Sequence, residues 1–167
     1  CNGTEATAAK WKPTISWKGK GRNVSDLSMG IDAFLKQKKC VGCNIDLVGF
    51  QCLNLSGADF SGSTLKRADF QHADLKGADF SKTKLSASIL HAVNLKNANL
   101  KGADIENTMF SSANLERARL NGANLKKVEL QGANLQNADL RNAKLRNVSF
   151  VNANLKGANF KGASLEG

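Results

Sequence analysis

The chain has 167 residues, enough for one domain with a sizeable core. Hydrophobic residues make up 41% of it, Gly occurs 15 times, Pro once and Tyr not at all. No apolar run approaches the ~20 residues that a membrane span needs. The formal net charge of +10 favours acidic partners but does not bear on the fold.

The N-terminal segment is polar. The sequence begins with Cys1 rather than Met, so we expect it to start inside a longer product, from which a targeting segment was removed or which was trimmed. Residues 1–22 are rich in Gly and Lys, with Trp11, Ile15 and Trp17 as their only large apolar anchors. We expect a tail that is flexible or partly held by the two Trp.

Residues 23–40 form a second unit, in which residues 25–39 predict a short helix. Its apolar residues share one helical face: Leu27, Ile31, Phe34 and Leu35. Ser25 is a good N-cap, and the Lys residues at the other end suit the C-terminal pole of a helix dipole.

A strict repeat of five residues follows. Every position divisible by five from Ile45 to Leu165, 25 in all, is Leu, Phe or Ile. The residue two places before each centre is small or compact, usually Ala, and Asp or Asn is common between them. Neither an amphipathic helix nor a half-buried strand has a period of five. A fixed period of this kind is typical of a solenoid.

Residues 41–165 resemble the pentapeptide-repeat family, whose motif is A(D/N)LXX. The resemblance implies a right-handed quadrilateral β-helix with four repeats per coil, hence about six coils, each rising ~4.8 Å. The centre and the compact residue before it would point inward, and stacked coils would supply the stability. We therefore expect an all-β solenoid over residues 41–167, with the helix of residues 25–39 covering its first coil.

The Phe residues test the four-sided arrangement. When the centres are sorted with a period of twenty, Phe occurs in two of the four columns: Phe50, Phe70, Phe110 and Phe150 in the second, and Phe60, Phe80 and Phe160 in the fourth. The other two columns contain Leu and Ile only. Large rings on opposite walls with slimmer side chains between them fit a closely packed core.

The C-terminal coil has no capping segment after Leu165, so Phe160 and Leu165 would be partly uncovered and strand edges left open. The resemblance indicates the same, because related members dimerise through their C-terminal ends. We expect self-association through this coil, or fraying of its last residues.

Three cysteines cluster where the repeats begin. The CVGC motif has the spacing of a redox or metal-binding pair, but Cys40 and Cys43 fall on inward positions, so we favour packing as small hydrophobic residues. A disulfide between Cys40 and Cys43, or one with Cys52, is the alternative; catalysis is disfavoured because no βαβ pattern is present. The stretch KKCVGCNIDLVGF resembles the start of the array in cyanobacterial members, some of which are exported. This suggests the periplasm or thylakoid lumen, with the cytoplasm as the alternative.

Two faces of the predicted coil differ in charge. The first face, around the column of Ile45, is basic: Lys66, Arg67, Lys84, Lys126, Lys127, Lys144 and Arg146. The second face, around the column of Phe50, has no Lys or Arg. It presents Ile89 and Met109 one coil apart, with Val151 further along. A charge-poor side with stacked apolar groups is typical of a docking surface, with scattered surface hydrophobes as the alternative.

The second face also carries potential soft-metal ligands. Cys52 and His72 should stack on successive coils, with His91 one coil further on. These three are weak candidates only, because no fourth ligand and no known motif accompany them, and we predict no metal or other cofactor. The third face has an outward polar row that we expect to bond to the backbone at the nearby corner: Asn54, Asp74, Asn94, Asn114, Asn134 and Asn154.

Function follows from comparing three classes. An enzyme needs a pocket with a nucleophile or an acid–base pair, whereas the inward positions here are filled by Leu and Phe. The family's DNA mimics of the gyrase-inhibitor type need an acidic surface, and this chain is basic. Weak non-specific nucleic-acid binding is an alternative that interleaved acids and the lack of a stacking platform disfavour. We predict a non-enzymatic structural or protein-interaction module of unknown partner.

Overall fold

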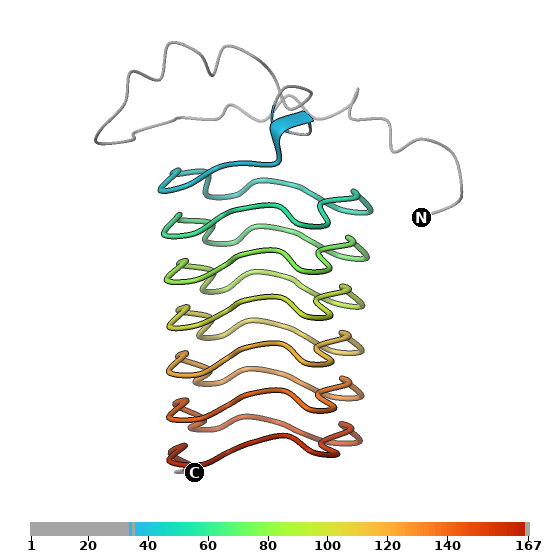
Figure 1. Ribbon diagram of the computed structural model, residues 1–167, viewed down its shortest axis with the longest axis vertical. Helices are drawn as coiled ribbons and strands as arrows, with labels where there is room; N and C mark the ends of the chain where they lie inside the picture. The colour runs from blue at the N-terminus through green and yellow to red at the C-terminus, as the bar shows by residue number, and fades with distance from the viewer. Residues whose placement is uncertain (1–33, 35, 166–167) are drawn as a thin grey trace.

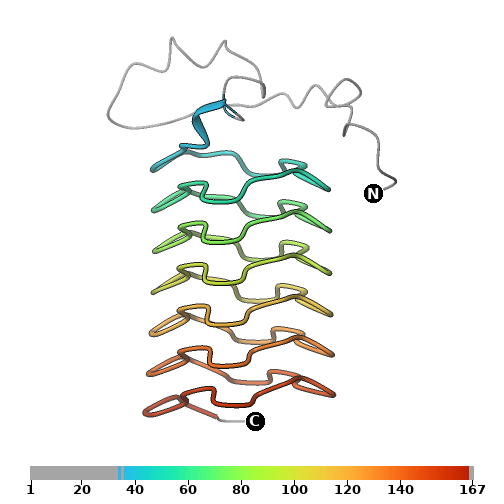
Figure 2. The ribbon, with the colours of Figure 1, turned by 45° about the vertical axis from the view of Figure 1, so that its right-hand side comes forward.

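The computed structural model of the chain describes residue 34 and residues 36–165. The tail expected over residues 1–22, and most of the helix expected over residues 25–39, lie outside the described residues. Residues 39–165 wind into a four-sided β-helix whose coils stack along one axis (Figures 1 and 2).

Each side of a coil contributes a single bridging residue, which pairs in parallel with the residue twenty positions later. The first bridge joins Lys39 to Asp59, two residues before the expected boundary at residue 41, and the last joins Lys144 to Ser164. No longer strand forms within residues 36–165. The period of twenty inferred from the Phe columns is therefore the register of the ladder.

The corners are four-residue turns. The Ala58 amide donates to the Leu55 carbonyl at 3.0 Å, and the equivalent bond recurs along the chain. The third residue of the turn has a positive φ, as at Gly57 (71°) and Arg67 (56°), while the second does not, which is the pattern of a type II turn. Glycine adopts this φ without steric cost, which explains its frequency two residues after the centre.

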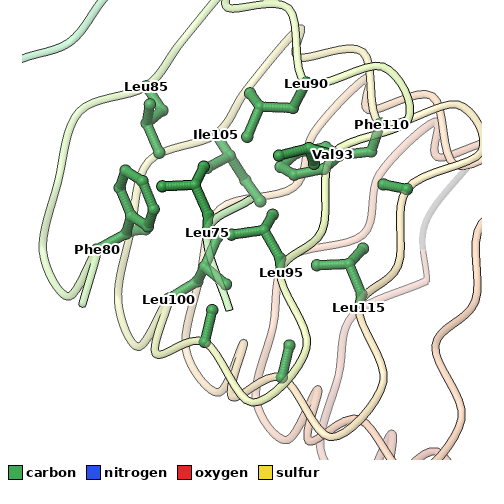
Figure 3. Packing of buried hydrophobic residues seen from close by; sticks show 14 of the residues in the cluster. Leu75, Phe80, Leu85, Leu90, Val93, Leu95, Leu100, Ile105, Phe110 and Leu115 are labelled. Atoms are coloured by element: carbon green, nitrogen blue, oxygen red, sulfur yellow. The ribbon is translucent and has the colours of Figure 1, made fainter. Parts of the chain in front are cut away.

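The interior is filled by two residues of each repeat, the centre and the compact residue before it. Figure 3 shows Leu75, Leu95 and Leu115 converging with Phe80 and Phe110 on the same core. The rings of Phe60 and Phe80 stack one coil apart with centroids 5.0 Å apart, whereas Phe70 and Phe80 meet edge to face at 5.8 Å. Columns of rings and columns of aliphatic side chains thus fill one narrow core.

Hydroxyl residues at compact positions are also buried: Ser63, Thr83, Ser88 and Thr108. Each donates to a carbonyl of the preceding coil; for example, Thr83 Oγ1 lies 3.0 Å from the Phe60 oxygen. Within the described part of the chain, no buried side-chain polar atom lacks a partner. Burial of these hydroxyls therefore carries no unsatisfied polar group.

The helix expected over residues 25–39 ends earlier than predicted. Phe34 and residues 36–37 have helical backbone, but Lys38 has a φ of 48° and Lys39 already belongs to the ladder. The run of Lys residues suggested that Lys39 belongs to the last turn of the helix. A charge pattern does not reveal at which residue the first β-bridge forms. The Phe34 ring lies 5.5 Å from that of Phe50 and 5.4 Å from that of Phe60, so it extends the aromatic columns.

A disulfide joins Cys40 and Cys43 across the first corner, with their Cα atoms 5.5 Å apart. Cys40 is buried and Cys43 partly buried, at the inward positions given by the repeat. Cys52 is likewise disulfide-bonded. Cys40 and Cys43 therefore both occupy inward positions and form a disulfide, because two inward positions on either side of a corner lie close together. The two interpretations of the sequence, packing in the core and a disulfide, are compatible.

Candidate interaction surface

The second face presents one outward residue per coil, in a row that runs along the axis: Gly49, Asp69, Ile89, Met109, Glu129 and Ser149. Ile89 and Met109 bridge each other, so their side chains stand next to one another on successive coils. Met109 is 39% exposed and Ile89 is half-buried. The sequence was thus sufficient to bring this apolar pair together.

Acidic residues flank the apolar pair on both sides within the row. Asp69 bridges Ile89, and its carboxylate accepts hydrogen bonds from Gln51 (2.7 Å) and from the Gln71 amide (3.0 Å). Glu129 bridges Met109 on the other side. The result is an apolar spot flanked by carboxylates.

Val151 does not join this spot. It is 60% exposed, but it occupies the corner column and belongs to the coil of Ser149, with the coil of Glu129 between it and Met109. The structure therefore separates the three residues that the sequence grouped on this face into a contacting pair and a distant third.

The weak metal candidates do not form a ligand set. His72 and His91 do meet, with ring centroids 5.8 Å apart and planes at 86°, because the His72 amide bonds to the His91 carbonyl on the next coil. The thiol of Cys52 is consumed in a disulfide. Residues 36–165 contain no group of three His, Cys, Asp or Glu side chains that could hold a metal ion.

The polar row on the third face forms a side-chain ladder. Its carboxyl or amide oxygens accept the backbone N–H two residues later at every coil, as from Asn114 to Glu116 at 3.1 Å. The amides also bond to one another between coils, continuously from Asp74 to Asn154. The bonds to the corner were predicted, whereas the ladder was not, although the spacing of twenty between Asn residues could have indicated it.

Ion pairs neutralise part of the surface charge. Lys96 lies 2.8 Å from Glu116 and lowers the pKa of that carboxyl through its hydrogen bond. Arg141 forms hydrogen bonds with both carboxylate oxygens of Asp139, which lower the pKa of Asp139 and raise that of the guanidinium. Sequence reasoning missed which cations are paired. Among the described residues, these two pairs and the contact of Arg117 with Glu116 are the ion pairs of the structure.

A family model described as pentapeptide repeat region matches residues 63–140 and 93–167. The chain belongs to the pentapeptide-repeat family. The overlapping matches span more than half of the chain, and the quadrilateral coil has the four repeats per turn that the resemblance implied. The prediction of an all-β, four-sided β-helix over the repeats is confirmed by the parallel bridges that recur with a spacing of twenty.

Several solved pentapeptide-repeat structures are similar to this chain. HetL, involved in heterocyst differentiation regulation in the cyanobacterium Nostoc sp. strain PCC 7120, is 20% identical over 75% of this chain and 87% of that one, with a TM-score of 0.39. Rfr23 of the cyanobacterium Cyanothece 51142 is 32% identical over 81% and 97%, with a TM-score of 0.34. A protein of the Arabidopsis thaliana thylakoid lumen is 37% identical over 70% of each chain, with a TM-score of 0.22.

No curated protein matches the pentapeptide-repeat chain. Among the described residues, no helical segment has the length and apolar character required to cross a membrane.

Proposed function

We propose that this pentapeptide-repeat protein is a non-enzymatic structural and protein-interaction module, a β-helix of about six coils capped by a short N-terminal helix. Its second face binds a protein partner. The observation that carries this proposal is the contacting pair of Ile89 and Met109 on the face that lacks Lys and Arg. Burying these side chains removes apolar area from water without desolvating a cation.

The packed interior supports a non-enzymatic role. The centres from Phe50 to Leu140 are at most 2% exposed, so the inside of the coil holds side chains rather than substrate. The ionisable groups of the described residues lie on the outside of the coil and not in its packed interior.

Substitution of Met109 tests the proposed function. We expect Met109→Glu to abolish binding of the partner. A carboxylate between Ile89 and Glu129 would be buried in the interface without a counter-charge. Affinity capture from extracts of the source cells, with quantitative mass spectrometry, compares the variant with the wild type.

Thr64→Glu is the matched control. It adds the same charge at an outward bridging position of the first face, between Asn44 and Lys84. The specific protein should be captured by this variant and by the wild type but not by Met109→Glu. Equal capture by all three would exclude the second face as the binding surface.

We also propose an oxidising compartment, either the periplasm or a thylakoid lumen. The Cys40–Cys43 disulfide supports it, since disulfides persist mainly in such environments. The 37% identity to a lumenal protein is in keeping with this compartment.

A further proposal is self-association through the coil that ends at residue 165. Leu155 is 36% and Leu165 64% exposed, while Leu135 and Leu145 in the same columns are buried. Among the described residues, this coil forms bridges to the preceding coil only, the last of them between Lys144 and Ser164. Such a surface offers both apolar area and open backbone groups to a second copy.

Sedimentation at millimolar concentration tests the association. We expect dimers of the full chain and monomers of Leu165→Lys and Phe160→Lys, because the ammonium group would be placed in the contact. Thr64→Lys, on a lateral face, should remain dimeric. A wild-type chain that is monomeric at this concentration would contradict self-association.

A further inference from the structure

Four cations gather on two successive coils of the first face: Lys126, Lys127, Lys144 and Arg146. We call them the basic patch. Lys127, Lys144 and Arg146 are exposed and Lys126 is partly so. The coils are held in register by the bond from the Lys127 amide to the Arg146 carbonyl at 2.9 Å. The β-helix therefore presents these charges at fixed spacing rather than on a flexible segment.

None of the four cationic groups forms an ion pair or side-chain hydrogen bond with a described residue. The nearby carboxylates either accept hydrogen bonds from another residue or lie on a different face from the four cations. Asn124 donates its amide to Asp104 at 3.0 Å and to Glu106 at 3.3 Å, so these acids of the preceding coil are held by a neutral group. Glu129 lies beside Met109 in the ladder and makes no ion pair with the patch.

The stacking of Lys126 on Arg146 distinguishes the patch from the other surface cations. These residues are twenty apart and occupy the same corner column, where like charges on neighbouring strands repel. Two other cation pairs stack in this way, and each has an ion-paired member. In the pair of Lys76 and Lys96, Lys96 binds Glu116, and in that of Arg141 and Lys161, Arg141 binds Asp139. Among the described residues, the pair of Lys126 and Arg146 is the stacked cation pair in which neither member forms an ion pair.

We propose that the basic patch binds a segment of a partner protein that is rich in Asp and Glu. Lysine supplies point charges and Arg146 a bidentate donor for carboxylates, while the fixed coil spacing avoids the entropy cost of ordering the backbone that carries them. This site goes beyond the proposed function, because it lies on the first face and not around Ile89 and Met109.

Carboxylates suit the patch better than other polyanions. No Phe or Trp is exposed in the described residues, so bases would find no aromatic platform for stacking. Four cations also give fewer contacts than the 6–10 phosphates that a typical duplex-binding protein neutralises. Leu47 is the exposed large apolar residue at an outward position of the first face, and it lies at the other end of that face. Leu165 is a centre of the end coil rather than an outward residue, so no outward apolar group accompanies the patch into a membrane.

A charge-reversal experiment tests the proposal on the intact chain. The probe is a short, fluorescently labelled peptide rich in Glu and Asp, titrated by anisotropy at about 50 mM and about 200 mM salt. We expect Lys126→Glu/Arg146→Glu to weaken binding at low salt at least about tenfold. The control Lys66→Glu/Arg67→Glu makes the same change in net charge on the same face, beside Asp46, and should bind like the wild type. A neutral variant, Lys126→Gln/Arg146→Gln, should show a smaller loss, and circular dichroism verifies its fold.

Competition distinguishes the classes of partner. Single-stranded DNA of equal charge and vesicles containing an anionic phospholipid should displace the peptide only weakly. Preferred binding of DNA or of vesicles would overturn the assignment to an acidic protein segment. Equal weakening in the 126/146 and 66/67 variants would show that net charge alone attracts the peptide, and that would overturn the site itself.

Discussion

Leu115→Ala is expected to lower the free energy of unfolding by about 2–5 kcal/mol. Leu115 is 1% exposed and lies in one column with Leu95 and Leu135, which are fully buried. Truncation would leave a cavity between two coils that the backbone ladder holds at a fixed spacing, so collapse is restricted. Leu115→Asp should prevent folding of the central coils, because a carboxylate in this core has no partner.

Leu47→Ala provides the matched control for Leu115→Ala. It makes the same change at a residue that is 62% exposed, and it should alter stability by less than about 0.5 kcal/mol. Urea denaturation followed by circular dichroism gives both values. A folded Leu115→Asp chain with an ordinary unfolding transition would show that the four-column register is wrong.

Phe70→Ala is expected to cost about 3–5 kcal/mol. The Phe70 ring packs against three others, with centroids 5.1 Å from Phe50, 6.0 Å from Phe60 and 5.8 Å from Phe80. The loss of the ring removes contacts within its own column and across the core. The free energy of unfolding, again from urea denaturation, should fall accordingly.

Phe160→Ala makes the same change where the ring is only partly buried and, among the described residues, meets one other ring, that of Phe150, with centroids 6.0 Å apart. It should cost clearly less than Phe70→Ala. If the two variants lose the same stability, the aromatic columns of the N-terminal coils are not the stabilising feature that the structure indicates.

The register of the fold was predictable from the sequence because each coil repeats the same packing problem. A fixed period of five places the centres inward, and the restriction of Phe to two columns reveals the period of twenty. The bridge between Ile89 and Met109 follows directly from this arithmetic. In most globular folds, contacts between distant residues cannot be obtained in this way, because no single period relates them.

Features that depend on side-chain choice or on the ends of the array were less predictable. The helix boundary at Lys38 depends on where the first bridge forms, which the charge pattern does not encode. Asn124 binds the carboxylates of Asp104 and Glu106, whereas formal charge alone would pair those acids with lysines. Val151 was predicted further along the same face as Ile89 and Met109, and the coil of Glu129 lies between it and Met109.

Site-specific cross-linking tests the proposed interaction surface most directly. A photo-crosslinking amino acid in place of Met109, illuminated in the source cells, should capture a protein partner that the same amino acid in place of Thr64 does not. Both positions are outward bridging residues, so the two probes differ only in the face they occupy. A specific adduct from position 109 alone is the predicted result. The same adducts from both positions, or none from position 109, would contradict the assignment of the second face as the binding surface.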